Sequence, residues 1–474
     1  MTPDGGGDFR KTETGQDLFS IKVFLVATGI LGAAFLGLTW ISRGELGLSD
    51  GTAQTPSEEA QLEPAESDAS KGFPSQLSQG EQILLATSAL PIKQEGAAAI
   101  ASGDYGAAVT AFERARRADV SDPETLVYLN NARIGEQEAY GLAIVVPLKS
   151  DPTTASSLLR GVAQAQTEIN QAGGIQGKSL RIFLADDQED VAIAQQIATD
   201  LSEFPDVVGV LGHNTTETAN ATSEIYTASA LPFVSTSAGA SPAIKQLLAN
   251  DLPIADALAF YMARLNHRTA ILFYDGNSDS SLAFKSNFEK ALQANQGTMT
   301  AEVNLAELSA SPPTETPTAE IFVLSPGDSP LKTATESIEI IPNDQVDHFY
   351  RHVFGGHELF SPEVLNLFGS MATGTILAVP EALYQSAASP FSEPTQDLWE
   401  KSTDWSTSAS YNLTQAVITG LKQSPTRQGV QQAIDSNTND AVRLLRVSIN
   451  PDTRTGYELL SLGVMTKDGF QPEG

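Results

Sequence analysis

Two adjacent carboxylates are the first feature of this chain that could do chemistry. Asp186 and Asp187 follow the apolar run SLRIFLA, and two carboxyl groups that share one proton can act as a general acid and base. Adjacent residues on a strand point to opposite faces, however, so these two would not converge on one proton. We expect the DDQED stretch to end a strand and to cap a helix that begins near Val191. No catalytic residue is predicted.

Three histidines that lie close together, His348, His352 and His357, raise the question of a metal site. The first two would share a face only on a helix, yet HFYRHVFGG has the pattern of a strand. The chain has no cysteine, no HExxH motif, no phosphate-binding loop and no G-x-S-x-G motif. We therefore expect histidines of the surface or of a cleft, and neither a metal nor a cofactor.

The elements that would position such residues alternate along the chain. Apolar runs such as GLAIVVPL, DVVGVLG and TAILFYD are separated by amphipathic helices such as VAIAQQIATDLSEF. This spacing predicts βαβ units and mostly parallel sheets. From Tyr140 onward the chain is long enough for two successive α/β lobes.

Composition limits the classes of partner. The formal net charge is −30, which repels phosphate backbones, so we expect no nucleic acid partner. The hydrophobic fraction of 41% is enough for a packed core.

An apolar stretch from Val23 to Ile41 predicts a membrane anchor, because about 19 helical residues span roughly 29 Å. Arg10, Lys11 and Lys22 precede it and Arg43 follows, which predicts a cytoplasmic N-terminus and an extracytoplasmic main part. A cleaved signal peptide and a buried core helix are the alternatives.

Residues 44–82 are acidic and rich in Ser, Pro, Gln and Gly, which predicts a disordered linker. Residues 83–136 have a helical pattern, with Ala108, Phe112 and Ala115 on one stripe. With the Gly-Asp-Tyr turn before them and Pro123 after them, they resemble part of a tetratricopeptide repeat. This segment would be either a docking module or a helical spacer.

Four stretches of the chain stand in a recognisable order: EINQAGGIQGKSLRIFLADDQED, LGHNTTETANATSEIY, LPFVSTSAGASP and SYNLTQAVITGLKQSPTRQGVQQAI. They resemble the type I periplasmic solute-binding proteins, in the leucine-binding-protein-like branch that serves ABC transporters of branched-chain amino acids. The resemblance covers about residues 140–474.

The resemblance implies an α/β fold of two Rossmann-like lobes with mostly parallel sheets, joined by three crossovers and closing over a ligand. We expect the crossovers near Asp251, Pro380 and Arg446. The implied organisation is a cytoplasmic tail (1–22), an anchor (23–41), a linker (44–82), a helical segment (83–136), lobe 1 (137–251 and 381–445) and lobe 2 (252–380 and 446–474).

The resemblance also implies ligand-binding residues in lobe 1. Thr216 matches the family's carboxylate-binding hydroxyl, with Thr215 as the alternative one residue away. Ser237, Ala238 and Gly239 match the second contact loop, whose backbone N–H and C=O groups would bind the charged ends of the ligand. A loop that leads into a helix N-terminus suits a carboxylate. Plain helix capping is the alternative role of the hydroxyl residues.

Other positions depart from the family. Asp279 is the nearest match where an aromatic residue often follows a lobe 2 strand. His357 stands where an acidic residue commonly binds the ligand ammonium. Because a cationic imidazole repels an ammonium group, either the adjacent Glu358 takes this role or the ligand is not an α-amino acid. Tyr411, on the late helix, would line the cleft or lie in the core.

The sequence thus predicts a membrane-anchored, extracytoplasmic solute-binding protein that is not an enzyme. Its ligand would be small and polar, with an amino acid as the first candidate, and its partner an ABC permease or another membrane protein. Two alternatives stay open: a ligand-free scaffold that docks partners, and a sensor that reports ligand to a membrane partner.

Overall fold

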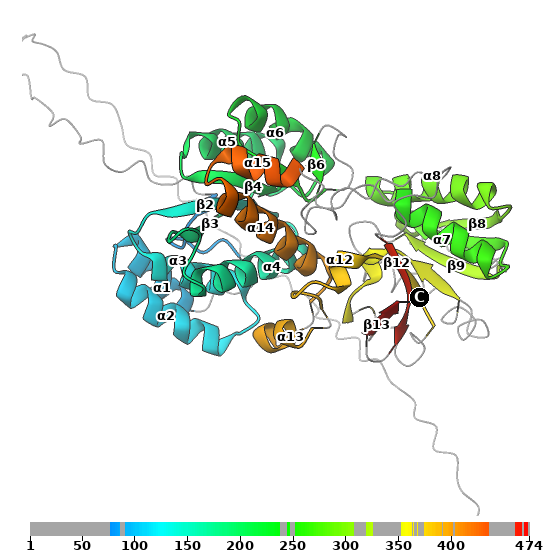
Figure 1. Cartoon of the computed structure of the whole chain (residues 1–474), viewed down its shortest axis with the longest axis horizontal. Coiled ribbons are helices and arrows are strands. Elements are labelled where there is room, and N and C mark those ends of the chain that lie inside the picture. The colour runs from blue at the N-terminus through cyan, green and yellow to red at the C-terminus, as the bar shows by residue number, and fades with distance from the viewer. Residues whose placement is uncertain are drawn as a thin grey trace, which may run out of the picture. The chain divides into compact units, whose positions relative to one another are not determined.

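The computed structural model describes residues 76–85, 91–237, 244–246, 252–307, 319–325, 352–362, 364, 367, 374–390, 392–401, 403–435, 460–466 and 469–472. The chain divides into two units, Met1–Ala69 and Ser70–Gly474, and all described residues belong to the second (Figure 1). The predicted tail, the predicted anchor and most of the predicted linker lie outside the described residues. No helix in the described part of the chain is long and apolar enough to cross a membrane.

The first sheet has six strands among the described residues, in the order β1-β3-β2-β4-β5-β6. Only β1 runs antiparallel to its neighbour. Alternate side chains of β2 enter different clusters, since Leu142 and Ile144 pack on one face and Ala143 and Val145 on the other. Burial of both faces explains the continuous apolar runs. The strands are β1 (Leu77–Ser78), β2 (Ala139–Val145), β3 (Ser179–Ala185), β4 (Val207–Gly212), β5 (Phe233–Ser235) and β6 (Lys245–Gln246).

Helices cover both faces of this sheet (Figure 1). One face carries α4 (Pro152–Gln171), α14 (Trp405–Gln423) and α15 (Arg427–Asp435), and the other carries α5 (Val191–Glu203) and α6 (Thr216–Ala228). Helices α4 and α14 approach closely at Gly161, where a Cβ atom would collide with the Thr407 carbonyl oxygen. Glycine is therefore required at this crossing.

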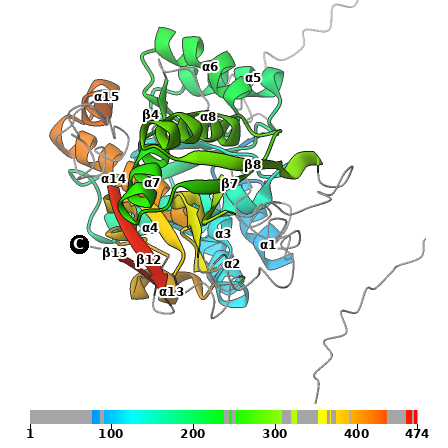
Figure 2. The same ribbon diagram turned by 90° about the vertical axis from the view of Figure 1, so that its right-hand side faces the viewer.

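The second sheet has the order β13-β12-β11-β10-β9-β7-β8 among the described residues. Strands β7 to β11 are parallel to one another, and β12 and β13 are antiparallel to their neighbours. Two helices, α7 (Leu252–Arg264) and α8 (Asp279–Ala294), cover one face, where Leu258 and Phe288 join Leu272 (Figure 2). The strands are β7 (Thr269–Tyr274), β8 (Thr298–Asn304), β9 (Ile321–Ser325), β10 (Val353–Gly355), β11 (Ile376–Pro380), β12 (Leu460–Thr466) and β13 (Gly469–Pro472).

The chain passes between the two sheets more than once. It leaves the first after β6 and enters the second at α7, and it returns after β11 through α12 (Glu381–Tyr384) and α13 (Glu393–Trp399) to α14. It reaches the second sheet again between α15 and β12, in residues outside the described part. Two short 3₁₀ helices, Leu305–Glu307 and His357–Leu359, follow β8 and β10. The expectation of two mostly parallel sheets is confirmed.

Three helices precede the first sheet: α1 (Pro91–Ala101), α2 (Tyr105–Ala118) and α3 (Pro123–Ile134). Asp104 and Asp122 cap α2 and α3, and the predicted stripe of Ala108, Phe112 and Ala115 is buried. Helix α3 is buried nearly all round and packs on α4 and β3. These helices are therefore continuous with the core of the first lobe.

Buried polar side chains fasten this segment. The Lys93 ammonium lies 2.7 Å from Asp122 Oδ2 and 2.6 Å from Glu124 Oε2, with all three side chains buried. Burial alone would lower the pKa of Lys93, but the carboxylates of Glu124 and Asp122 outweigh it and raise the pKa. Asn131 donates to the Ile182 carbonyl and accepts from the Ile182 N–H, which ties α3 to β3.

The predicted linker extends too far at its C-terminal end. Leu77 and Ser78 form β1, pair with Ala185 and Leu184 of β3, and are buried. The prediction was wrong here because the acidic, polar composition hides a two-residue strand. Its stability comes from the sheet edge rather than from its own apolar pattern.

Candidate functional site

The carboxyl ends of β2 and β4 mark the topological switch point of the first sheet, where the order in which successive strands are added reverses. Strand β2 has β3 on one side and β4 on the other. The helix that follows β2 packs on one face of the sheet and the helix that follows β4 on the other. In open α/β sheets, ligands bind outside the carboxyl ends of the strands at such a point.

A tight turn leads from β4 into α6. Gly212 has φ +148° and lies against the Val145 backbone, and His213 follows with φ +54°. Thr215 then caps α6, since its side chain accepts from the Thr218 N–H at 3.3 Å. Thr216 is the first residue of the helix. Thr215 therefore caps α6, whereas the Thr216 hydroxyl has a different partner.

The loop after β5 meets this turn. The Ser235 hydroxyl donates to the His213 carbonyl at 3.1 Å and accepts from the Ser237 N–H at 3.0 Å. The hydroxyls of Thr216 and Ser237 lie 3.2 Å apart. Two of the predicted ligand residues are thus brought together at the N-terminus of α6, where partial positive charge favours an anion. Ala238 and Gly239 lie outside the described residues.

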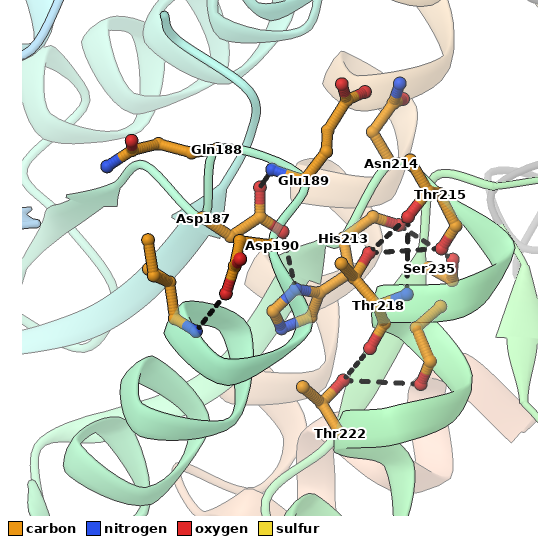
Figure 3. A network of polar contacts seen from close by, with 12 residues as sticks. Asp187, Gln188, Glu189, Asp190, His213, Asn214, Thr215, Thr218, Thr222 and Ser235 are labelled. Atoms are coloured by element: carbon orange, nitrogen blue, oxygen red, sulfur yellow. Dashed lines mark hydrogen bonds and ion pairs between the residues drawn. The ribbon is translucent and has the colours of Figure 1, made fainter. Parts of the chain in front are cut away.

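A buried network lies beneath the two loops (Figure 3). His213 Nδ1 lies 2.8 Å from Asp187 Oδ2, and His213 Nε2 lies 2.9 Å from the Tyr226 hydroxyl. His213 and Asp187 are fully buried, and Tyr226 is 1% exposed. Burial, followed by the charge of Asp187, raises the pKa of Tyr226 well above its usual value. No sequence pattern predicted this network, and the His in LGHNTT was the signal that could have indicated it.

The two adjacent aspartates have different partners. Asp186 Oδ2 lies 3.1 Å from the Lys149 ammonium, whereas Asp187 binds His213. Strand β3 ends at Ala185, just before both, and Asp190 caps α5 through the N–H groups of Ala192 and Ile193. The pair therefore does not form a shared-proton site, as the strand geometry predicts. Within the described ranges, no group of three or more His, Asp or Glu side chains could hold a metal.

The lobe 2 candidates lie on other elements. Asp279 is the first residue of α8, capped by Ser278. His357 and Glu358 form a short 3₁₀ helix after β10, with His357 Nδ1 3.7 Å from Glu358 Oε2. The His357 ring meets the Trp405 ring edge to face, at 4.7 Å between centroids. His357 is 5% exposed.

Tyr411 lies between α14 and α4. Its hydroxyl donates to Glu168 Oε2 at 2.6 Å, and the residue is 7% exposed. Burial, together with the bond to Glu168, raises the pKa of Tyr411. Of the nine candidates, the structure thus joins Thr216 to Ser237 and His357 to Glu358, and it places Tyr411 in a helix interface.

Comparisons with known proteins bear on this geometry. Residues 142–315 match a protein family described as periplasmic binding protein. No curated protein matches the chain. Proteins of the matched family bind solutes without transforming them, which agrees with the prediction that the chain is not an enzyme.

Three solved structures show the same fold. The branched-chain amino acid transporter substrate-binding protein LivJ from Streptococcus pneumoniae, in complex with isoleucine, has 16% identity and a TM-score of 0.52, over 70% of this chain and 98% of that one. A substrate-binding periplasmic protein from Ralstonia solanacearum has 16% identity and a TM-score of 0.53, over 70% of this chain and 100% of that one. A solute-binding protein of an ABC transporter from Rhodopseudomonas palustris, in complex with 3,4-dihydroxybenzoic acid, has 14% identity and a TM-score of 0.53. The match covers 71% of this chain and 96% of that one. Residues 142–315 therefore match the periplasmic binding protein family, and the chain has the fold of these solute-binding proteins.

Proposed function

We propose that this chain is the solute-binding component of an ABC transporter and that it binds a small ligand with a carboxylate group. The observation that carries the proposal is the pair of hydroxyls of Thr216 and Ser237, 3.2 Å apart at the start of α6. Hydroxyl donors and a helix N-terminus together stabilise a negative charge. Their place outside the carboxyl ends of β4 and β5 is where α/β sheets bind ligands.

The relatives support a carboxylate as the shared feature of the ligand. The Streptococcus pneumoniae structure holds isoleucine and the Rhodopseudomonas palustris structure holds 3,4-dihydroxybenzoic acid. Both molecules carry a carboxylate, and only the first carries an ammonium group. The carboxylate is therefore assigned to lobe 1, and the remainder of the ligand to lobe 2.

An amino acid is the first candidate ligand because lobe 2 offers an acidic partner for an ammonium group. Glu358 is mostly buried, with 12% of its side chain exposed, and would take this role in place of His357. Asp279, at the start of α8, is the second acidic candidate. An aromatic carboxylate, which needs no such partner, is the alternative ligand.

Calorimetric titration of the full-length chain in detergent tests the proposal. The titrants are the proteinogenic L-amino acids, benzoate and 3,4-dihydroxybenzoate. We expect one of these classes to bind, and the Thr216→Ala/Ser237→Ala double variant to bind about 100- to 10,000-fold more weakly, since it removes two hydrogen bonds to a charged group that contribute about 1.5–3 kcal/mol each, and about 1.4 kcal/mol is tenfold in affinity. The matched control is Ser223→Ala, which removes a hydroxyl that bonds only within α6. Undiminished affinity in the double variant contradicts the site.

We further propose that residues 23–41 anchor the chain and that the binding domain works outside the cytoplasm next to a permease. The apolar composition of this stretch supports the anchor, and the periplasmic family match supports the compartment. If the roughly 30 residues that follow the anchor behave as their composition predicts, they would reach only roughly 30 Å, so the permease would have to be a near neighbour.

A ligand-free scaffold is the second candidate, and two contacts favour it. Tyr411 bonds to Glu168, and the His357 ring is covered by Trp405, so two predicted ligand contacts are already used within the protein. A scaffold would show no ligand-induced rise in melting temperature with any titrant. Because α3 is buried, the helical segment is better explained as a spacer than as a separate docking module. A sensor function would require a membrane partner.

A further inference from the structure

We propose that His213 is a positioning residue of the solute site, whose buried ring fixes the turn from which both hydroxyl loops leave. The proposal rests on the proposed function of this edge of the sheet and names a determinant that touches no ligand itself. Its basis is the way one residue joins three strand ends and one helix, as Figure 3 shows for Asp187, His213 and Ser235.

The ring is held on both nitrogens. Nδ1 lies 2.8 Å from Asp187, in the turn after β3, and Nε2 lies 2.9 Å from the hydroxyl of Tyr226, near the end of α6. The Phe233 ring of β5 packs edge-on at 5.7 Å between centroids. Asp187 is itself fixed, because its other oxygen accepts from the Glu189 N–H at 3.2 Å. The ring therefore has one position available.

The backbone of the same residue connects the neighbouring strands. Its N–H donates to the Val145 carbonyl of β2 at 2.9 Å, and its carbonyl accepts from the Ser235 hydroxyl of β5 at 3.1 Å. With φ at +54°, His213 is in the left-handed region, which costs energy for a residue with a side chain. Such a conformation persists only when its surroundings enforce it, and the ring contacts are what enforce it here.

Hydrogen-bond chemistry selects the tautomer. A carboxylate only accepts, so Nδ1 carries a proton toward Asp187. Burial raises the pKa of Tyr226, which keeps its hydroxyl proton and can donate it to Nε2. Of the two neutral tautomers, Nδ1–H is thus the one that satisfies Asp187 and Tyr226 together.

Ser235 connects the position of His213 to ligand binding. This side chain bonds the His213 carbonyl and the Ser237 N–H, and the Ser237 hydroxyl meets that of Thr216. A shift of the His213 backbone would therefore move both hydroxyls relative to each other. A ligand carboxylate would lose its matched donors without losing any residue that touches it.

Three variants of the full-length chain test the proposal: His213→Phe removes both ring bonds, His213→Asn keeps a donor toward Asp187, and Tyr226→Phe removes one bond. With whichever titrant binds the unaltered chain, we expect His213→Phe to weaken binding about 10- to 100-fold, as loss of a supporting residue does in other sites. We expect His213→Asn to restore affinity to within about fivefold, with Tyr226→Phe in between. His267→Asn is the control for loss of a histidine elsewhere.

Two ligand-independent measurements separate this proposal from the proposed function. Long-range ¹H–¹⁵N spectra should show one of the five histidines as a neutral Nδ1–H tautomer whose signal disappears in His213→Asn. Hydrogen exchange should rise at residues 213–218 and at 235–237 in His213→Phe and, by a smaller factor, in Tyr226→Phe, which also covers the case that His213→Phe does not fold. An Nε2–H tautomer, unchanged exchange at 235–237, or full affinity in His213→Phe overturns the proposal. Absence of binding by the unaltered chain counts against the proposed function alone.

Discussion

Glu189 is the carboxylate at the ligand edge whose charge is least favoured. Burial raises its pKa, hydrogen bonds from Ser150 and Asn214 oppose the rise, and the nearby charges of Asp151 and Asp187 add to it. Figure 3 shows its side chain extending beside Asn214, which immediately precedes the capping Thr215. Its ionisation therefore acts on the same edge that the proposed ligand uses.

This pKa shift makes stability depend on pH at one residue. Because the pKa of Glu189 is higher in the folded chain than in the unfolded chain, unfolding releases a proton between the two values, and stability falls as pH rises through that interval, from about 4.3 upward. We expect Glu189→Gln to be more stable than the unaltered chain at pH 7.5, by less than about 1 kcal/mol because the group is partly solvated. The difference should vanish near pH 3.5. Thermal unfolding at both pH values measures it, and a larger gain at the acidic value contradicts the sign.

At this scale the sequence predicted the hydroxyls and not their support. Thr216 and Ser237 lie in local motifs, so their positions followed from the resemblance. The meeting of His213 with Asp187 and Tyr226 depends on a left-handed backbone at His213 that no periodicity indicates. A buried polar network of this kind is visible only once the strands are placed side by side.

At the scale of elements, α2 holds the segment by which the chain returns to the first lobe. Arg116 donates to the Leu398 carbonyl at 2.5 Å, and its guanidinium lies 4.8 Å from the centroid of the fully buried Trp399 ring. Helix α13 is also close to α4, where Thr395 lies 3.4 Å from Gln164. This crossover is therefore fixed to the first lobe at its C-terminal end.

We expect Arg116→Ala to loosen α13, because it removes a charge-assisted hydrogen bond and a cation–π contact that together contribute about 2–3 kcal/mol when partly buried. Hydrogen exchange of residues 393–399 should rise at least tenfold. The exposed neighbour Arg117 provides the control, and Arg117→Ala should leave exchange unchanged. Equal exchange in both variants would show that α4 alone holds α13.

Periodicity predicted most long elements and failed on short ones. The helix predicted in VAIAQQIATDLSEF is α5, with Ala194, Ile197 and Leu201 buried, since a long amphipathic pattern is decided by local spacing. β1 has two residues and takes its stability entirely from pairing with β3, so its composition alone predicted that it belongs to the linker. β12 and β13 close the second sheet from the end of the chain, and such distant pairing leaves no local signal.

At the scale of the whole molecule, the helical segment is part of the first lobe rather than an addition to it. β1 covers the edge of β3, and Asn131 of α3 bonds the backbone of Ile182. Gln166 of α4 in turn donates to the side-chain oxygen of Asn131 at 2.9 Å. The boundary near residue 137 is thus a boundary of resemblance and not of folding.

Truncation tests this unity. We expect residues 70–474 to melt near the temperature of the full-length chain, and residues 137–474 to melt about 10 °C lower or to aggregate, because the latter exposes the β3 edge and unpaired polar groups. Calorimetry and light scattering on the two fragments measure this. A shorter fragment that is monomeric and equally stable would show that the helices are dispensable.

The two-residue β1 strand also has a mechanical consequence. Force that arrives along the chain from residues before 76 reaches Leu77 and Ser78 before it reaches α1, and their pairing with Ala185 and Leu184 is short. A modest pull would peel this strand away while the buried Lys93–Asp122–Glu124 cluster still held the helices behind it. Leu77 and Ser78 would then be the first residues to detach under force, and the sheet edge that carries the solute loops would stay intact.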